Sequence, residues 1–195
     1  MESTNHGLGR REFLKAAAAG TVLLASGPAI EAAAKGKSAP SGPSAATSSS
    51  PSPRIYVCDT CGHVEFGTAP EFCPVCHAEE RFRIKNTIFA DALAKLKDGG
   101  AKHTPVIRVQ EKSTLVSDVP CKEVHVRVGE IMHELEPKNH IHFIDFYLDG
   151  RFFTRFFASP EMQPAVVLFV KAPASKIKAV SYCNLHGFWQ AEVPL

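Results

Sequence analysis

Two Cys-x-x-Cys pairs constrain this chain more than any other feature of its sequence. Cys58 and Cys61 form the first pair, Cys73 and Cys76 form the second, and eleven residues separate the two pairs. At this spacing four thiolates can surround one metal ion tetrahedrally, each pair on a tight turn of a short hairpin. Two disulfides are the alternative, but a bond within a Cys-x-x-Cys turn is strained. The pattern therefore predicts a small four-cysteine metal domain over residues 54–84.

The metal of this domain is expected to be iron or zinc, because four thiolates suit both ions. The string from Tyr56 to Cys76 resembles the rubredoxin-like module of rubrerythrins, with an aromatic residue two positions before the first cysteine and a glycine after the first pair. This resemblance implies a one-electron iron centre. His77 departs from it, because many rubredoxins have glycine after the second pair. Iron is the expected metal, and a structural zinc ribbon is the alternative.

Alternating apolar and polar residues predict an antiparallel β-sandwich after the four-cysteine domain. Six segments alternate as half-buried strands do, and turn signals such as Asp149-Gly150 and Ser159-Pro160 separate some of them. The segments are 106–109, 123–128, 141–148, 152–157, 165–170 and 176–182. Several short strands in so few residues are typical of an immunoglobulin-like sandwich. The expected fold is mainly β, with this sandwich over residues 102–195, a helical connector over 85–101 and a short helix from Ile84 to Lys97.

Histidines and one cysteine fall on the loops between these strands, where they can converge on one metal ion. A single histidine is more often a surface or core residue than a ligand. A cysteine and a histidine three residues apart on a turn, however, can hold one ion together. Several such residues at the ends of strands therefore favour a second metal site. The candidates are His103, His133, His140 with His142, Cys183 and His186.

This second segment resembles the superoxide reductases, the family of desulfoferrodoxin and neelaredoxin. The resemblance covers residues 102–195 and is most specific in Lys102-His103-Thr104-Pro105, in residues 128–133 and in residues 182–189. In that family an Fe(II) ion has four equatorial histidines, one axial cysteine thiolate and one open position. Carried over by position, three of these histidines and the thiolate fall on His103, His133, His186 and Cys183.

The fourth histidine of the family has no direct counterpart. Asn139 stands at its position, and His140 is the next residue. Because side chains alternate along a strand, a bulge would be needed to turn His140 towards the metal. Three arrangements remain open: a rearranged His140 ligand, an amide oxygen of Asn139 or a water in its place, or a site that has lost its activity. His140 is included in the expected ligand set.

The resemblance implies reduction of superoxide to hydrogen peroxide at this non-haem iron. Cys183 would be the axial thiolate that pushes electron density onto the metal, and Lys102 would attract the anionic substrate. The glutamate that commonly precedes this lysine in the family is replaced by Ala101. The alternative is a non-catalytic iron-binding or electron-transfer protein with a degenerate site.

The resemblance also bears on the partners of the chain. The four-cysteine iron would relay or store electrons from an unidentified donor, such as a rubredoxin or another redox protein. Related proteins are often dimers or tetramers, so the resemblance allows a homo-oligomer.

The first 53 residues are expected to be an export signal, residues 1–34, followed by a flexible linker, residues 35–53. Arg10 and Arg11, followed by Phe-Leu-Lys, resemble the twin-arginine export signal, and cleavage is expected after Ala34. Residues 35–53 are rich in Ser, Pro, Ala and Gly, so they cannot bury enough apolar surface to fold. The protein is therefore expected in the periplasm or on the outer face of the cytoplasmic membrane. The remaining residues carry 17 basic and 17 acidic side chains, which argues against nucleic-acid binding.

Overall fold

The computed structural model describes residues 53–96, 99–113, 115–171 and 173–195. The expected export signal, residues 1–34, lies outside the described residues, and so does the expected linker apart from Pro53. The described residues belong to one compact unit, which includes both the four-cysteine segment and the strands that follow it. No helix among them is long and apolar enough to cross a membrane.

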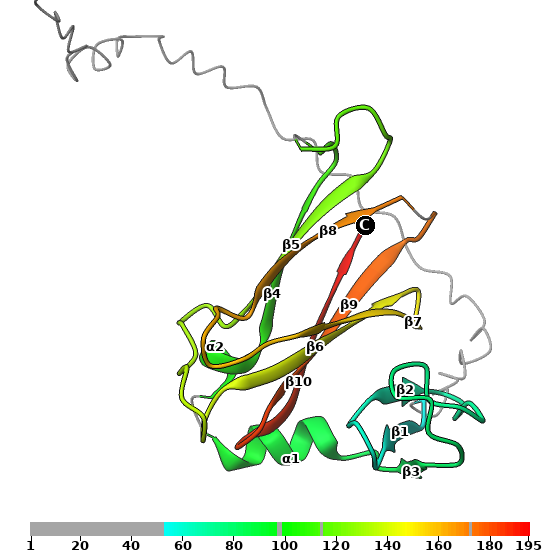
Figure 1. Cartoon of the computed structure of the whole chain (residues 1–195), viewed down its shortest axis with the longest axis vertical. Coiled ribbons are helices and arrows are strands. Elements are labelled where there is room, and N and C mark those ends of the chain that lie inside the picture. Colours follow the sequence, from blue (N-terminus) through cyan, green and yellow to red (C-terminus); the bar gives the residue numbers. More distant parts are fainter. Residues whose placement is uncertain (1–52, 97–98, 114, 172) are drawn as a thin grey trace, which may run out of the picture. The chain divides into compact units, whose positions relative to one another are not determined.

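Two antiparallel sheets form the sandwich (Figure 1). One sheet has the strand order β10-β9-β6-β7, and the other has the order β4-β5-β8. Apolar side chains from both sheets, such as Val124, Phe146 and Ile177, form the core between them. The expected immunoglobulin-like sandwich is thereby confirmed. The strands are β4 Pro105–Gln110, β5 Lys122–Val128, β6 Ile141–Leu148, β7 Arg151–Phe157, β8 Ala165–Val170, β9 Lys176–Cys183 and β10 Gly187–Pro194.

Each of the six expected strands is present, and its ends differ from the expected ones by at most one residue. β10 lies outside the expected strands, although Trp189, Ala191 and Val193 alternate with polar residues there. The helix α1, Ile88–Lys95, begins later than the expected Ile84. The reason is that Ile84 belongs to a strand and the N–H of the next residue, Lys85, donates to the carbonyl of Ile55 (2.8 Å). A second short helix, α2, spans Gly100–His103.

The four-cysteine segment folds as a small three-stranded sheet with two cysteine turns, and we call it the knuckle domain. Its strands are β1 Ile55–Cys58, β2 Val64–Phe66 and β3 Phe82–Ile84, in the order β2-β1-β3. Each turn is closed by backbone hydrogen bonds, including Gly62 N–H to Cys58 O and His77 N–H to Cys73 O, both 2.9 Å. His77 has φ +58°, so it takes the left-handed conformation that glycine adopts more easily. The substitution seen in the sequence therefore keeps a glycine-like turn at a small conformational cost.

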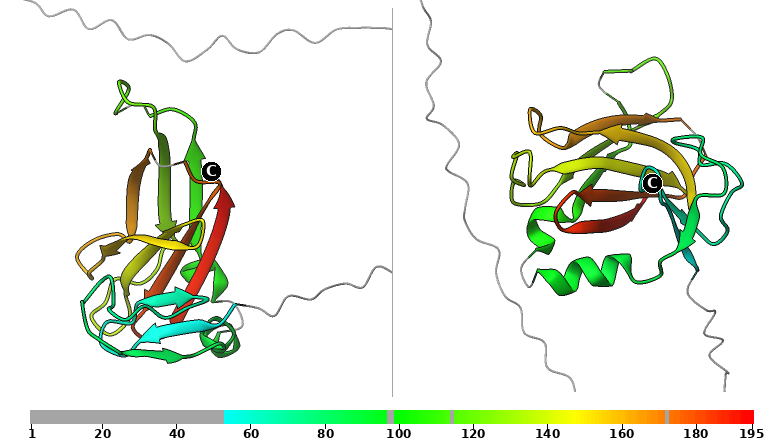
Figure 2. Two further views of the ribbon diagram at one scale, coloured as in Figure 1. Left: turned by 90° about the vertical axis from the view of Figure 1, so that its right-hand side faces the viewer. Right: turned by 60° about the horizontal axis from the view of Figure 1, so that its bottom comes forward.

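Strand β6 is buried on both faces, which explains its long apolar run. Ile144, Phe146 and Leu148 face the core between the two sheets. Tyr147, on the opposite face, packs with Val57 and other apolar residues in a second core. Figure 2 shows the strands of the knuckle domain, in cyan, next to the strands of the sandwich. The Tyr147 hydroxyl also donates to the backbone carbonyl of a knuckle residue. The knuckle domain therefore packs on the outer face of the four-stranded sheet.

A buried charge network crosses this contact. The carboxylate of Asp145 accepts hydrogen bonds from Arg155 Nε (2.5 Å) and Nη2 (2.8 Å), and it lies 2.8 Å from His63 Nδ1. Arg155 Nη1 donates to the carbonyl of Cys61 (2.9 Å). Burial alone would lower the pKa of His63, but its hydrogen bonds to Asp145 and Glu65 outweigh burial and raise that pKa. The network thus places an imidazole with a raised pKa and a guanidinium around one carboxylate inside the contact.

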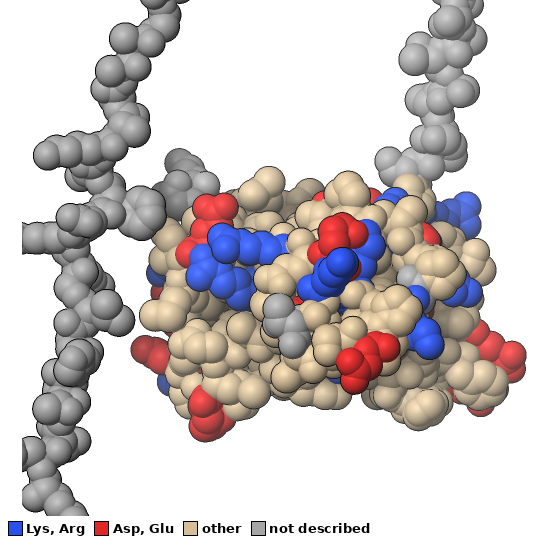
Figure 3. Space-filling model, turned by 90° about the horizontal axis from the view of Figure 1, so that it is seen from above, with Lys and Arg blue, Asp and Glu red and all other residues tan. Residues whose placement is uncertain are grey.

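Charged side chains on the surface differ from the buried Asp145 network because they are exposed to solvent. On the face shown in Figure 3, basic and acidic side chains lie side by side. One exposed pair of the chain joins Lys176 Nζ to Glu192 Oε1 at 3.0 Å. Exposed pairs of this kind contribute little to stability, about 1 kcal/mol or less. They provide a reference against which the buried network can be tested.

We predict that Asp145→Asn lowers the free energy of unfolding by about 3–5 kcal/mol, because it removes the charge that compensates buried Arg155. Urea unfolding of the metal-loaded protein, followed by Trp189 fluorescence, measures the loss. Glu192→Gln is the matched control and should cost about 1 kcal/mol or less. Equal losses in the two variants would show that the Asp145 network does not hold the knuckle domain on the sheet.

Candidate metal centres

The knuckle domain brings its four cysteines together around one point. Their sulfur atoms lie within 4.8 Å of one another, with Cys58 Sγ 3.8 Å from Cys76 Sγ and Cys61 Sγ 3.5 Å from Cys73 Sγ. Four sulfurs bound tetrahedrally at about 2.3 Å would be about 3.8 Å apart. These distances are too long for disulfides, and all four cysteines are free. The donor set and its spacing fit a tetrahedral iron or zinc ion.

A second group lies at the end of the sandwich where α2 meets the β9–β10 turn. It contains one ligand atom each from His103, His133, Cys183 and His186, all within 4.8 Å of one another. His103 Nε2 is 3.0 Å from His186 Nδ1, and Cys183 Sγ is 3.5 Å from the same nitrogen. Two nitrogens bound at right angles to one ion at about 2.1 Å would be about 3.0 Å apart. The structure therefore brings these four candidates together at a spacing that suits one metal ion.

Backbone carbonyls fix which imidazole nitrogens face the centre. His103 Nδ1 lies 2.7 Å from the carbonyl of Gly99, and His133 Nδ1 lies 2.7 Å from the carbonyl of Glu134. A carbonyl can only accept, so both Nδ1 atoms carry the proton and both Nε2 atoms present a lone pair. His133 Nε2 is buried and has no hydrogen-bond partner among the described residues. A metal ion would satisfy this orphaned nitrogen.

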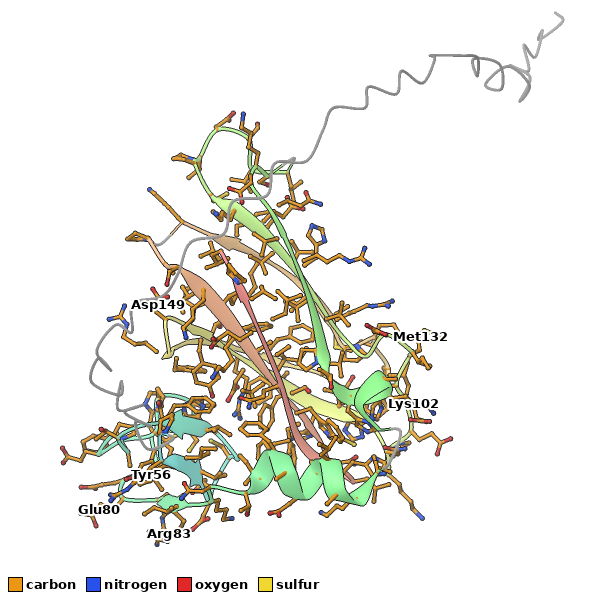
Figure 4. All side chains as sticks on the ribbon, turned by 180° about the vertical axis from the view of Figure 1, so that it is seen from behind. Tyr56, Glu80, Arg83, Lys102, Met132 and Asp149 are labelled. Carbon is orange, nitrogen blue, oxygen red and sulfur yellow. The ribbon has the colours of Figure 1, made fainter. Side chains whose placement is uncertain are left out.

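Three loops are held together to position these side chains. The Ser181 hydroxyl on β9 donates to the carbonyl of His103 (2.8 Å), which fixes the end of α2 against the sheet. Gly129 follows β5 with φ +83°, and a Cβ there would lie 2.6 Å from the carbonyl oxygen of Lys102. Only glycine permits this approach, which brings the loop that carries His133 against α2. Figure 4 shows Lys102 and Met132 on this side of the sandwich, while Tyr56, Glu80 and Arg83 lie in the knuckle domain.

Burial disfavours protonation of the imidazoles at this site and so favours metal binding. It is the main cause that lowers the pKa of His103 to about 4, and it also lowers the pKa of His186. Both imidazoles are therefore neutral near pH 7, the state that binds metals. Burial raises the pKa of the Cys183 thiol. An incoming metal ion must displace that proton to bind the thiolate.

The structure does not bring His140 into this group. Its Nδ1 lies 3.1 Å from the carbonyl of Glu136 and 3.3 Å from Asn184 Nδ2. The side chain of Asn139 points to the site instead, with Oδ1 3.5 Å from Cys183 Sγ. Asn139 and His140 directly precede β6, and their side chains have different partners, as the sequence predicts for neighbouring residues of extended chain.

Lys102 borders a pocket that also contains His103, Asn139 and His186. Its ammonium group pairs with Glu134 Oε1 at 2.5 Å, and this hydrogen bond is the main cause that lowers the pKa of Glu134. Sequence reasoning did not assign Glu134 a role at the site. Its position directly after His133 is the only signal that could have indicated one.

Comparisons with known proteins match the two segments of the chain that contain the candidate metal groups. The family model described as Desulfoferrodoxin matches residues 95–192, and the model of the rubrerythrin rubredoxin-like domain matches residues 56–83. A desulfoferrodoxin from Nitratidesulfovibrio vulgaris is 34% identical over 140 residues, which cover 71% of this chain and 94% of that protein. A superoxide reductase from Pyrococcus abyssi is 38% identical over 109 residues, covering 49% of this chain and 89% of that protein.

Among solved structures, the superoxide reductase from Treponema pallidum has a TM-score of 0.47 and 20% sequence identity. The match covers 71% of this chain and 97% of that chain. Family assignment therefore depends on the sequence matches.

We predict that the chain binds two metal ions at independent sites. Cys61→Ser combined with Cys73→Ser should lose one ion per chain, and His103→Ala combined with Cys183→Ala should lose the other. Cys121, a free cysteine outside both groups, offers the matched control, since Cys121→Ser should keep both ions. Elemental analysis of protein purified without oxygen gives the count. Loss of both ions in either double variant would contradict two independent sites.

Proposed function

Because the chain belongs to the desulfoferrodoxin family, we propose that it reduces superoxide to hydrogen peroxide at the site of His103, His133, Cys183 and His186. The observation that supports this proposal is that three imidazole nitrogens and one cysteine sulfur meet around a single point. Relatives named superoxide reductase support the reaction. The alternative, a non-catalytic metal site, is tested by the experiment below.

The reaction adds one electron and two protons to superoxide and gives hydrogen peroxide. An iron ion held by these residues would supply the electron. The three imidazoles are neutral ligands, so Cys183 is the only one of the four that removes positive charge from the ion. A site of this composition retains net positive charge and attracts an anion. The thiolate of Cys183 would also donate electron density to the bound ion, which would favour reduction of the substrate.

Lys102 and Glu134 would set the electrostatic potential at the entrance to the site. Lys102 borders the pocket, and a free ammonium there would attract superoxide. Glu134 is paired with it, however, and compensates its charge. The two residues should therefore act on the association rate in opposite directions.

We also propose that the knuckle domain holds iron and passes electrons to the second site. A line of contacts supports such a route. Gly62, beside Cys61, packs against the Phe143 ring, where a Cβ would lie 3.4 Å from Cζ. The Phe143 ring stacks on that of Tyr182, with centroids 5.2 Å apart, and Tyr182 directly precedes Cys183. The external donor, a rubredoxin or another redox protein, remains a prediction, as does the oligomeric state.

Export by the twin-arginine route remains a proposal as well. Its support is Arg10 and Arg11 with the Phe-Leu-Lys that follows them, in a segment outside the described residues. A protein that loads its metals before export suits a route known to carry folded proteins. Under this proposal the protein acts in the periplasm or on the outer face of the cytoplasmic membrane.

The function is tested by mixing the reduced, metal-loaded protein with superoxide generated by pulse radiolysis and following oxidation of the site by its absorption. We predict a second-order reaction. At low ionic strength, Lys102→Gln should slow it by about threefold to tenfold, and Glu134→Gln should accelerate it by a similar factor. Both differences should shrink as salt is added, because screening weakens each charge.

Lys112 is an exposed lysine on the β4–β5 connection, outside the pocket at the second site, and it provides the control. Lys112→Gln should leave the rate and its salt dependence nearly unchanged. A reduced site that is not oxidised by superoxide would contradict the proposed function. Equal effects of Lys102→Gln and Lys112→Gln would contradict the role of Lys102.

A further inference from the structure

The side chain of Asn139 lies beside the second metal group. The sequence alone did not decide whether this side chain is a ligand. Its Oδ1 lies 3.5 Å from Cys183 Sγ, the same distance that separates this sulfur from His186 Nδ1. Asn139 also borders the same pocket as His103 and His186. The amide oxygen therefore lies as far from the sulfur of Cys183 as one of the candidate ligand nitrogens does.

This separation is one that two ligands of a single ion can have. With metal bonds of about 2.3 Å to sulfur and about 2.1 Å to oxygen, atoms 3.5 Å apart subtend an angle of about 105° at the metal. That angle lies between the values of octahedral and tetrahedral sites. The distance therefore allows Asn139 Oδ1 and Cys183 Sγ to bind one ion together.

His140, the competing candidate, is held in a separate network. Its backbone N–H donates to Asn184 Oδ1 (3.0 Å), and its carbonyl accepts from the N–H of Asn184 (3.2 Å). Its ring faces the carbonyl of Glu136 and the amide of Asn184. Turning this ring to the metal would break those contacts and would move Asn139 to the opposite face of the chain.

The backbone on the other side of Asn139 is also fixed. Asn139 N–H donates to the carbonyl of Glu136 (2.9 Å), and Glu136 N–H donates back to the carbonyl of Asn139 (3.2 Å). This small hairpin ends one residue before the contacts of His140. The two sets of hydrogen bonds leave Asn139 with its side chain directed to the sulfur of Cys183.

We propose that Asn139 is the fifth protein ligand of the second metal ion, bound through its amide oxygen. The ion is then held by three imidazoles, one thiolate and one carboxamide, a harder and less electron-donating set than four imidazoles and a thiolate. This inference rests on the metal site of the proposed function but not on the reaction with superoxide. It makes Asn139 a replacement ligand rather than the mark of a lost site.

The test is an anaerobic titration of the full-length chain with Co(II) in competition with a chelator, followed by the absorption of the bound ion. Asn139→Ala should weaken binding at the second site by at least about tenfold, since even groups that only orient ligands contribute roughly 10–100-fold. The ligand-field absorption bands of Co(II) bound to this variant should be more intense than those of Co(II) bound to the unmodified chain, because the coordination number is lower. Asn139→Asp should bind at least as tightly as the unmodified chain, because a carboxylate presents an oxygen at the same place. The four-cysteine site serves as the internal reference in every variant.

His140→Ala is the matched control and should leave the affinity of the second site unchanged. If it weakens binding while Asn139→Ala does not, His140 is the ligand and the proposal is overturned. If Asn139→Asp binds as weakly as Asn139→Ala, the amide N–H acts as a donor to the thiolate, which also overturns it.

Two further outcomes separate this inference from the proposed function. An unmodified chain that binds no Co(II) at the second site overturns both the metal site and the role of Asn139. A chain that shows the predicted pattern of affinities but does not react with superoxide overturns the proposed function alone.

Discussion

The second metal centre depends on two buried imidazoles whose Nδ1 atoms already donate hydrogen bonds to backbone carbonyls. The carbonyls of Gly99 and Glu134 take the Nδ1 protons of His103 and His133, so the two Nε2 lone pairs must face inward. Leaving one such buried atom without a partner costs about 1–3 kcal/mol. A bound cation removes that cost for His133 Nε2, which has no other partner among the described residues. The fold is therefore arranged for a metal ion before the ion arrives.

Patterns that depend on nearby residues were sufficient to predict much of this structure. Alternation predicted six strands of the sandwich, and two Cys-x-x-Cys pairs predicted the knuckle domain. The turn that carries Cys183 and His186 is also local, because β9 pairs with β10 directly across it, as the pair Cys183 with Gly187 shows. His103 and His133 were already candidates because they lie between strands. The resemblance to a known family connected them to that turn, which no local pattern does.

Other features depend on how distant strands pair, and the sequence did not determine them. A shift of one residue decides between Asn139 and His140, and the first pair of β6 with β9, Ile141 with Cys183, lies directly after them. The contact between the knuckle domain and the sheet was also not predicted. Its signal was present, since Asp145 and Arg155 are opposite charges within apolar strands and face each other across β6 and β7. Recognising it requires the register of that hairpin and the position of His63 over it.

The site is proposed to reduce superoxide rather than dismute it, and the products distinguish the two reactions. The most direct measurement mixes the reduced, metal-loaded protein in excess with a known amount of superoxide and determines hydrogen peroxide and dioxygen. The account predicts one hydrogen peroxide for each superoxide consumed and no dioxygen, because the protein supplies the electron. One hydrogen peroxide and one dioxygen for every two superoxide ions, or no reaction beyond the spontaneous one, would contradict it.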